Sequence, residues 1–458
     1  MKTALVLFNR DLRTHDHPAL AAAARADRVL PLFVFDEALL ASRLAAPNRL
    51  AFMREALLDL DESLRAAGGR LLVRQGDPVR EAVALARQAG ATELHVSADW
   101  SAYARRREQR LRRACAEERI EFVAHPGVTV VEPGAVTPTG GDHFKVFTPY
   151  HRAWAAAPRR RPLGAPRRLA VPAGPSAGRI PPLRKLLGES SRTGSRAPSP
   201  SRAQGGEREA RRLKSAFLRQ GLVAYEDRHD DLPGDATSRL SAYLRFGCLS
   251  PLELAADAES RPGGSAYVRQ LCWRDFNHQV LAAFPALPRR DYRPRSDRWS
   301  RSRRALDAWR EGLTGYPIVD AGMRQLAAEG FMHNRARMVV ASFLCKDLYL
   351  DWKAGAGHFW DLLLDGDVAN NAGNWQWVAG TGNDTRPNRV LNPLRQAKRF
   401  DPEGDYVRRY VPELEAVPGS AVHRPWRLQG AERPRNYPAP LVDHDEATAA
   451  FLAHREDS

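Results

Sequence analysis

Four side chains around position 270 have types and a spacing suited to chemistry. Gln270, Trp273, Arg274 and Asn277 stand at positions i, i+3, i+4 and i+7 of a helix predicted over residues 265–284, so they share one face. Two amides, an indole and a guanidinium on one stripe are typical of the wall of a polar, aromatic pocket. A solvated helix face with one Trp would give the same spacing, so the stripe alone leaves both interpretations open.

A second candidate wall lies further along the chain. Asn334, Arg337 and Met338 are spaced by three and four on a helix predicted over residues 332–348. They would share one side of that helix in the same way.

Two acids flank a glycine after an apolar helical segment. Asp365 and Asp367 stand on either side of Gly366, and Asn370-Asn371 and Trp375-Gln376-Trp377 follow. Paired acids can bind a metal ion, but no His or third carboxylate stands at metal-ligand spacing, so we predict no metal. Ion pairs to Arg, or hydrogen bonds to a cofactor, suit these residues better.

The run Thr237-Ser238-Arg239-Leu240-Ser241 stands where a helix is predicted to begin. Hydroxyls and free N–H groups at a helix N-terminus can hold a phosphate, and Arg239 adds charge. Plain N-capping accounts for the same residues.

Tryptophan is concentrated in the second half of the chain. Packing of a large helical core would explain any single one. Stacking on bases or relaying electrons would explain several together. The Trp residues beyond position 270 are Trp273, Trp299, Trp309, Trp352, Trp360, Trp375, Trp377 and Trp426.

The elements that must position these residues fall into two classes. Apolar strands are predicted at 3–8, 29–35, 70–74, 93–98 and 120–124, with helices at 18–24, 48–67, 78–88 and 103–118 between them. This alternation predicts a five-stranded parallel sheet in a Rossmann-like α/β domain. No G-x-G-x-x-G or P-loop sequence follows the first strand, so neither a dinucleotide site nor a P-loop is expected there.

The rest of the chain is predicted to be a connector and an all-helical domain. Residues 157–206 are rich in Pro, Gly, Ser and Arg, which is typical of an interdomain connector. We predict an α/β domain over 1–130, a connector over 131–206 and a large all-α domain over 207–458. Helical periodicity is found at 240–246, 265–284, 305–313, 317–328, 332–348 and 358–364.

Charge and composition narrow the class of protein. Lys+Arg is 70 against 54 Asp+Glu, a net charge of +16, and only 7 of the 70 are Lys. The Arg preference fits a GC-rich coding bias, whereas the net charge favours a nucleic-acid partner. The sequence has no apolar run of about 18 residues, no export leader and 4 Cys without a C-x-x-C pair, so we expect a cytoplasmic protein without a membrane span, disulfides or an iron–sulfur cluster.

Five motifs in chain order resemble the photolyase/cryptochrome family. They are W-R-D-F (273–276), T-G-Y-P-I-V-D-A-x-M-R-Q-L (314–326), M-H-N-R-x-R-M (332–338), S-F-L-x-K-D-L (342–348) and D-G-D-x-A-x-N with W-Q-W (365–377). R-D-L-R (10–13), near the first strand, fits the same family. The resemblance covers nearly the whole chain apart from the connector, and the linked motifs are far more specific than any one of them.

The resemblance implies a helical domain that binds FAD noncovalently in a folded conformation. It implies that Arg337 pairs with Asp365 beside the isoalloxazine and that Asn371 lies by flavin N5. An electron relay would run from Trp375 through Trp352 to Trp299 at the surface. The other implied FAD contacts are Tyr225, Thr237, Ser238, Arg239, Leu240, Ser241, Gly366 and Asp367.

The implied reaction is light-driven repair of cyclobutane pyrimidine dimers in UV-damaged DNA by a monomeric lyase. Excited, reduced flavin passes one electron to the dimer, the ring splits, and the electron returns. The dimer must leave the base stack, so an aromatic pocket receives it. That pocket would consist of Gln270, Trp273, Arg274, Asn277, Asn334, Met338 and Trp377, with Gln270, Asn334 and Asn371 as the catalytic residues.

Gln270 departs from the pattern of the cyclobutane-specific enzymes, which commonly carry Glu there. Gln occurs at this position in six–four photolyases and animal cryptochromes, but those relatives carry a His pair where this chain has Asn334 and Met338. We therefore expect cyclobutane repair at modestly lowered efficiency. A six–four photolyase and a cryptochrome-like blue-light photoreceptor remain the alternatives. The chain ends about 30 residues after Trp426, short for a disordered signalling tail, which favours repair.

A second, antenna chromophore is also implied by the resemblance. Phe33, Arg49 and Asp99 fall near strand ends or a helix start of the α/β domain, where a planar ligand could dock. We expect 8-hydroxy-5-deazaflavin rather than methenyltetrahydrofolate. An empty cleft is the alternative.

Overall fold

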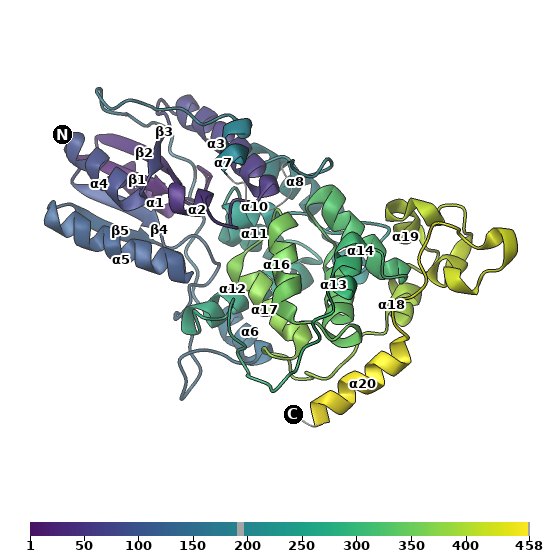
Figure 1. Ribbon diagram of the computed structural model, residues 1–458. Coiled ribbons are helices and arrows are strands. Elements are labelled where there is room, and N and C mark those ends of the chain that lie inside the picture. The colour runs from purple at the N-terminus through teal and green to yellow at the C-terminus, as the bar shows by residue number, and fades with distance from the viewer. Residues whose placement is uncertain (190–196, 457–458) are drawn as a thin grey trace.

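The computed structural model describes residues 1–189 and 197–456, and its N-terminal part is an α/β domain. One five-stranded sheet with the order β3-β2-β1-β4-β5 forms its centre, and every neighbouring pair of strands is parallel, as the sequence predicts. The strands are β1 (Thr3–Phe8), β2 (Arg28–Asp36), β3 (Leu72–Gly76), β4 (Glu93–Ser97) and β5 (Glu121–His125). The helices are α1 (Pro18–Ala23), α2 (Glu37–Leu40), α3 (Pro47–Ala66), α4 (Pro78–Gln88) and α5 (Ala102–Glu117) (Figure 1).

Both faces of the sheet are buried. Alternate residues of a strand point to opposite faces, so Val6 and Phe33 join the core shared with α3 and the helical domain. Leu7 and Leu32 join a separate core with α4 and α5. Two buried faces explain why the strands are continuous apolar runs in the sequence.

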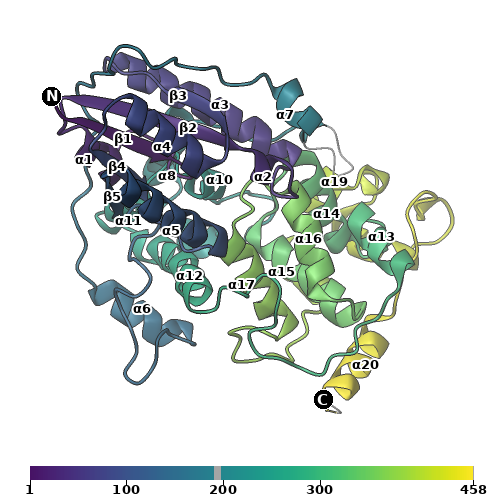
Figure 2. The same cartoon turned by 60° about the vertical axis from the view of Figure 1, so that its left-hand side comes forward.

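The segment between the domains contacts both of them. Its helix α6 (Phe147–Ala156) packs on α12 (Gly264–Ala283), and α7 (Leu183–Glu189) packs on α3 (Figure 2). The backbone N–H of Val73 donates to Ala177 O at 2.7 Å, which ties the connector to β3. Residues 190–196 of the predicted connector lie outside the described residues.

The C-terminal part is helical, as predicted. Besides α12, its helices are α8 (Glu207–Gln220), α9 (Tyr225–Arg228), α10 (Ser241–Phe246), α11 (Pro251–Glu259), α13 (Arg303–Glu311), α14 (Pro317–Glu329), α15 (Asn334–Ser342), α16 (Trp352–Leu362), α17 (Val368–Ala379), α18 (Pro393–Phe400), α19 (Asp405–Tyr410) and α20 (His444–Glu456). Short 3-10 turns connect α19 and α20: Pro412–Leu414, Gly419–His423, Pro425–Arg427 and Gly430–Glu432.

Two predicted helix boundaries were wrong. The helix expected over 332–348 is α15 followed by a π-helical turn, Phe343–Asp347. The helix expected over 358–364 is α16, which begins six residues earlier, at Trp352. Two glycines, Gly355 and Gly357, weaken the helical pattern there, whereas Asp351 caps the true start by accepting the Lys353 N–H at 2.9 Å.

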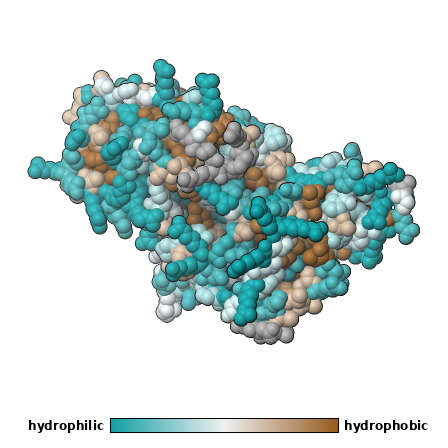
Figure 3. All heavy atoms as spheres, viewed as in Figure 1, coloured by the Kyte–Doolittle hydropathy of each residue, from teal (hydrophilic) through white to brown (hydrophobic). Residues whose placement is uncertain are grey.

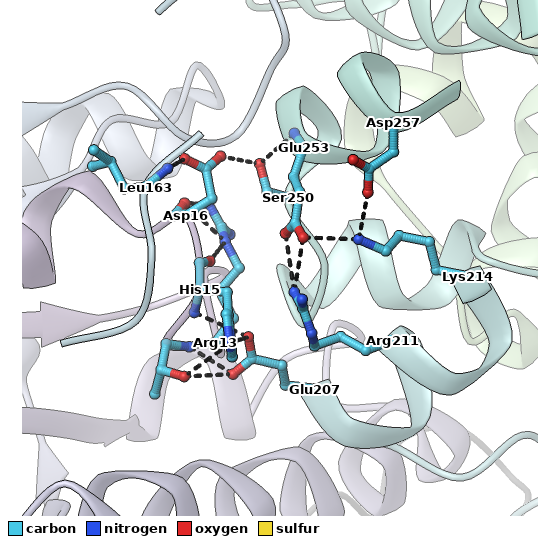
Figure 4. A network of polar contacts seen from close by, with 11 residues as sticks. Arg13, His15, Asp16, Leu163, Glu207, Arg211, Lys214, Ser250, Glu253 and Asp257 are labelled. Atoms are coloured by element: carbon cyan, nitrogen blue, oxygen red, sulfur yellow. Dashed lines mark hydrogen bonds and ion pairs between the residues drawn. The ribbon is translucent and has the colours of Figure 1, made fainter. Parts of the chain in front are cut away.

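A buried polar network joins the two domains and the connector (Figure 4). Glu207 at the start of α8 accepts N–H groups from Thr14 and His15, at 2.7 and 3.0 Å. Asp16 accepts the Leu163 N–H at 2.9 Å and the Ser250 hydroxyl. Because the carboxylates are buried and fully bonded, removing either one would leave several donors unpaired.

The outer surface is mostly hydrophilic on the face drawn in Figure 3. Within the described residues, no helix is long and apolar enough to cross a membrane, and no cluster of three or more His, Cys, Asp or Glu could hold a metal ion.

Candidate active site

One cavity of about 470 Å³ opens in the helical domain, between α10, α12, α15 and α17. The four residues of the α12 stripe all line it, which confirms that their spacing places them on one face. The predicted site residues that line the cavity are Tyr225, Thr237, Ser238, Arg239, Leu240, Ser241, Gln270, Trp273, Arg274, Asn277, Asn334, Arg337, Met338, Asp365, Gly366, Asp367, Asn371, Trp375 and Trp377.

One end of the cavity carries hydroxyl groups. Helix α10 begins at Ser241, the last residue of the predicted phosphate segment, and no side chain of the described residues caps it. The Thr237 hydroxyl is buried without a partner among the described residues. Burial raises the pKa of Tyr225 to about 12, so its phenol stays a hydrogen-bond donor at neutral pH.

Arg239 is less suited to a phosphate than the sequence suggests. Its guanidinium pairs with Asp235 and Glu329, each at 2.6 Å. Two carboxylates neutralise its charge, so it brings no net positive charge to the cavity. Arg245, which the sequence reasoning missed, also lines the cavity and donates to Gly366 O at 3.2 Å. Burial lowers the pKa of Arg245 to about 10, which still leaves it cationic at neutral pH.

The middle of the cavity holds an ion pair. Arg337 on α15 lies 2.8 Å from Asp365, and its Nε donates to Met332 O at 2.7 Å. The second oxygen of Asp365, Oδ1, is buried without a partner among the described residues. Asn371 on α17 donates to Ala356 O at 3.1 Å, which fixes its amide against α16. A ligand here would meet one unpaired carboxylate oxygen and one fixed amide.

Asp367 connects the cavity to the α/β domain. It caps α17 by accepting the Asn370 N–H at 2.9 Å, and it pairs with Arg10, which also lies 3.4 Å from Asp99. Burial opposes ionisation of Asp367, but Arg10 and the neighbouring His278 hold its pKa well below the usual range. The carboxylate is therefore ionised at neutral pH.

The mouth of the cavity is amphipathic. Gln270 and Asn334 are exposed there. The Trp273 ring stacks on Phe147 of α6 at 3.6 Å, with an angle of 3° between the rings. The Trp377 ring lies 5.1 Å from the Arg389 guanidinium.

Comparison with known proteins decides the family. Residues 4–170 match the family model of DNA photolyase, and residues 267–457 match that of the FAD-binding domain of DNA photolyase. A deoxyribodipyrimidine photo-lyase of Streptomyces griseus is 54% identical over 457 residues, 98% of each chain. The chain belongs to the DNA photolyase/cryptochrome family.

Solved structures of this family share the fold. A bacterial class III photolyase from Agrobacterium tumefaciens superposes with a TM-score of 0.89 at 30% identity, covering 100% of this chain and 98% of its own. A cryptochrome of Synechocystis sp. PCC6803 gives 0.90 at 29% identity, with 99% of both chains covered. Both branches of the family therefore have this architecture.

The cavity fits the FAD expected of this photolyase-family domain. Thr237 Oγ1 and Asp365 Oδ1 are buried and unpartnered, as groups that bind a polar ligand should be. Gly366 fits close packing in the cavity wall, since a Cβ there would lie 3.0 Å from the Arg49 guanidinium.

The three Trp residues implied as a relay lie in or against one hydrophobic cluster of the helical domain. Trp375 lines it, and a Cβ on Gly355 would lie 2.2 Å from the Trp375 ring. Trp352 stands one turn before Gly355 on α16, so these two indoles belong to the same packed region. Trp299 is partly buried, packs against the same cluster and contacts the Tyr349 ring at 5.0 Å.

The three residues implied for the antenna make different contacts within the protein. Phe33 is a core residue that packs on Phe35. Arg49 is buried, and its guanidinium donates to the backbone carbonyls of Leu44, at 3.1 Å, and Leu363, at 2.9 Å. These bonds make Arg49 a contact between the domains. Asp99 is paired with Arg10.

Phe147 was missed because it lies in the predicted connector. Its signal in the sequence is the apolar spacing of Phe147, Tyr150 and Trp154, which all lie buried on α6. Asn370 was also missed as a site residue, although it accepts the Asn277 amide at 3.0 Å across the cavity wall.

Proposed function

We propose that this protein repairs cyclobutane pyrimidine dimers in UV-damaged DNA, using FAD and light. The observation that carries the proposal is a single cavity with two chemically different ends. Hydroxyls, an Arg–carboxylate pair and a fixed amide line its depth, and exposed amides and indoles line its mouth. The depth suits a nucleotide cofactor, and the mouth suits a pair of bases extruded from DNA.

The residues in the depth hold and orient the cofactor. Thr237 and the N–H groups at the start of α10 suit phosphate oxygens, and Arg245 supplies the positive charge that Arg239 lacks. The Arg337–Asp365 pair and Asn371 offer a cation, a carboxylate oxygen and an amide to a flavin edge. Bound in its reduced form, FAD would supply the light-driven electron and take it back.

The residues at the mouth receive the lesion. Phe147 covers one face of Trp273, which leaves the indole rigid and its other face for a pyrimidine. Stacking on such a ring is worth about 1–3 kcal/mol per base, which offsets part of the cost of flipping the dimer out. Asn334 and Arg274 can donate to carbonyl oxygens on which negative charge develops, and Arg274 Nη2 is buried without a partner in the described chain.

The surface charge supports a DNA substrate. A net charge of +16 favours binding to phosphates regardless of sequence. Binding to undamaged duplex should therefore weaken steeply with salt, whereas the preference for the lesion, which depends on the cavity, should weaken less. A repair role on chromosomal DNA suits a monomer in the cytoplasm.

Two other functions have support from specific observations. The likeness to a cryptochrome structure favours a photoreceptor, and Gln270 favours six–four lesions. Asn334 and Met338 at the cavity mouth offer no His pair for six–four chemistry. We favour cyclobutane repair over these two functions because the indole and amide groups at the mouth fit two stacked bases.

The test is repair of defined lesions by pre-reduced holoprotein under light and in the dark. We expect light-dependent loss of cyclobutane dimers and none of six–four photoproducts. Trp273→Ala should lose repair through weaker lesion binding, whereas Gln220→Ala, which alters an exposed residue outside the cavity, should not. Turnover of six–four lesions alone would overturn the lesion assignment, and FAD binding without any repair would favour the photoreceptor.

We also propose an antenna chromophore in the α/β domain, with 8-hydroxy-5-deazaflavin favoured over methenyltetrahydrofolate. Release of bound chromophores by denaturation, followed by absorption and mass measurement, tests this. FAD as the sole released chromophore from protein expressed in a host that makes both candidates would refute it.

A further inference from the structure

Trp299, the last Trp of the implied relay, contacts a tyrosine ring. The Tyr349 ring lies 5.0 Å from that of Trp299, at an angle of 44°. On the other side, Tyr349 stacks on His454 of α20 at 4.7 Å and 11°. Tyr349 thus lies between the last indole and the C-terminal helix, in direct contact with both.

A proton acceptor lies beside the Tyr349 phenol. Its hydroxyl donates to Asp297 Oδ1 at 3.2 Å, and Arg455 Nε lies 3.1 Å from the same oxygen. Asp297 Oδ2 is buried with no partner among the described residues, so the carboxylate has an unused site for a proton. Burial raises the pKa of Asp297 above its usual value, although Arg455 opposes the shift. Burial, followed by the nearby Asp297 carboxylate, raises the pKa of Tyr349, so the phenol is protonated at neutral pH.

The backbone holds this arrangement in place. Tyr349 has a φ of +49°, a left-handed conformation that a bulky residue rarely adopts. Its carbonyl accepts the Ser300 N–H at 2.7 Å, and Ser300 and Leu350 form an isolated parallel bridge. The bridge fixes the segment that carries Trp299 against the segment that carries Tyr349.

We propose that Tyr349 is the terminal electron donor of the relay, with Asp297 as its proton acceptor. The inference rests on the proposed function, because the oxidant would be a Trp299 radical cation, which bound, oxidised FAD would generate through the relay when it absorbs light. One electron passes from Tyr349 to Trp299, and the phenolic proton passes to Asp297. The products are neutral Trp299, a neutral Tyr349 radical and protonated Asp297, so charge and atoms balance. An added thiol then reduces the Tyr349 radical.

The test is a light flash on oxidised holoprotein, followed by transient absorption and electron paramagnetic resonance. In the wild type we expect a Trp radical that converts to a Tyr radical. Tyr349→Phe should abolish the Tyr radical and lengthen the life of the Trp radical by about tenfold or more. Tyr410→Phe is the matched control, because its hydroxyl also donates to a carboxylate, that of Glu329, while its ring packs on Tyr406.

Deuterated water gives a second readout, because the transfer from Tyr349 moves a proton. Conversion of the Trp radical to the Tyr radical should slow by about two- to fivefold, while the earlier steps stay unchanged. A Tyr radical that persists in Tyr349→Phe, no Tyr radical in the wild type, or no isotope effect would each overturn the inference. Loss of dimer repair alongside a normal Tyr349 radical would overturn the proposed function alone.

Discussion

A methyl group added at Gly355 should press on the wall of the cavity. Gly355 lies on α16, where a Cβ would stand 2.2 Å from Trp375 Cη2 and 2.5 Å from Leu344 Cδ2. Carbon atoms pack best at about 3.5 Å or more, so the Trp375 ring would have to move by about 1.3 Å. Since Trp375 lines the cavity, that movement narrows the space available to FAD.

Gly357 supplies a matched control on the same helix. The three atoms nearest to a Cβ there all belong to the Arg43 guanidinium, the closest at 3.0 Å, and that side chain is 56% exposed and can move away. Replacing Gly by Ala inside a helix gains about 1 kcal/mol in both variants. Overpacking costs about 1–3 kcal/mol at Gly355 alone. Gly355→Ala should therefore unfold about 1–3 kcal/mol more easily than Gly357→Ala, because the helix gain cancels in the comparison.

Urea unfolding of both variants, with and without FAD, measures this difference. FAD titration followed by flavin fluorescence should show affinity about tenfold weaker in Gly355→Ala, equivalent to about 1.4 kcal/mol, and unchanged in Gly357→Ala. Equal stabilities and equal FAD affinities in the two variants would refute the packing of Trp375 against α16.

Three further predictions concern the interface, the lesion and the relay. Burial raises the pKa of Glu207, but the His15 and Thr14 contacts outweigh it and hold that pKa below the usual value. The free energy of unfolding that the carboxylate contributes is therefore present above about pH 4.3 and is lost as the pH falls through the lower pKa of the folded state. Urea unfolding at stepped pH should show a shallower acid loss in Glu207→Gln than in the wild type, and parallel curves would contradict this. Gln270→Glu should raise the quantum yield of cyclobutane repair by about two- to fivefold, the effect of about 0.5–1 kcal/mol, and an unchanged yield would show that position 270 does not touch the lesion. Trp352→Phe should slow photoreduction of oxidised flavin and spare repair by pre-reduced protein, and equal photoreduction rates would reject the relay.

Most of the fold was predicted from patterns that repeat every two to four residues in the sequence. The five strands were predicted because each is an apolar run buried on both faces, and the α12 stripe because a helix repeats every three to four residues. The start of α16 was missed because Gly355 and Gly357 weaken the pattern, although Gly355 is required by the Trp375 ring that packs against it. Close packing between residues of two different helices leaves no pattern in the sequence around either residue.

Around the cavity, contacts between segments that are distant in the chain could not be predicted from the sequence either. Phe147, in the predicted connector, covers Trp273 from 126 positions away in the chain, a difference given by their residue numbers. No local pattern links the two rings. The carbonyl of Leu363, 314 positions beyond Arg49, likewise accepts from its guanidinium at 2.9 Å, a contact that the place of Arg49 at a helix start does not reveal.

The charge of the phosphate end depends on which arginine is neutralised, and spacing alone does not reveal this. Arg239 stands in the predicted phosphate run, but Asp235 and Glu329 both pair with it. Arg245 stands four residues after Ser241, one turn further along α10. It donates to a carbonyl and forms no ion pair among the described residues. Even partial burial makes a cation without a paired carboxylate unfavourable unless an anion pairs with it. The diphosphate of FAD is such an anion, so Arg245 rather than Arg239 should carry the dependence of FAD affinity on charge. Arg245→Met should weaken FAD binding more than Arg239→Met, and the reverse order would show that the carboxylates leave Arg239 before FAD binds.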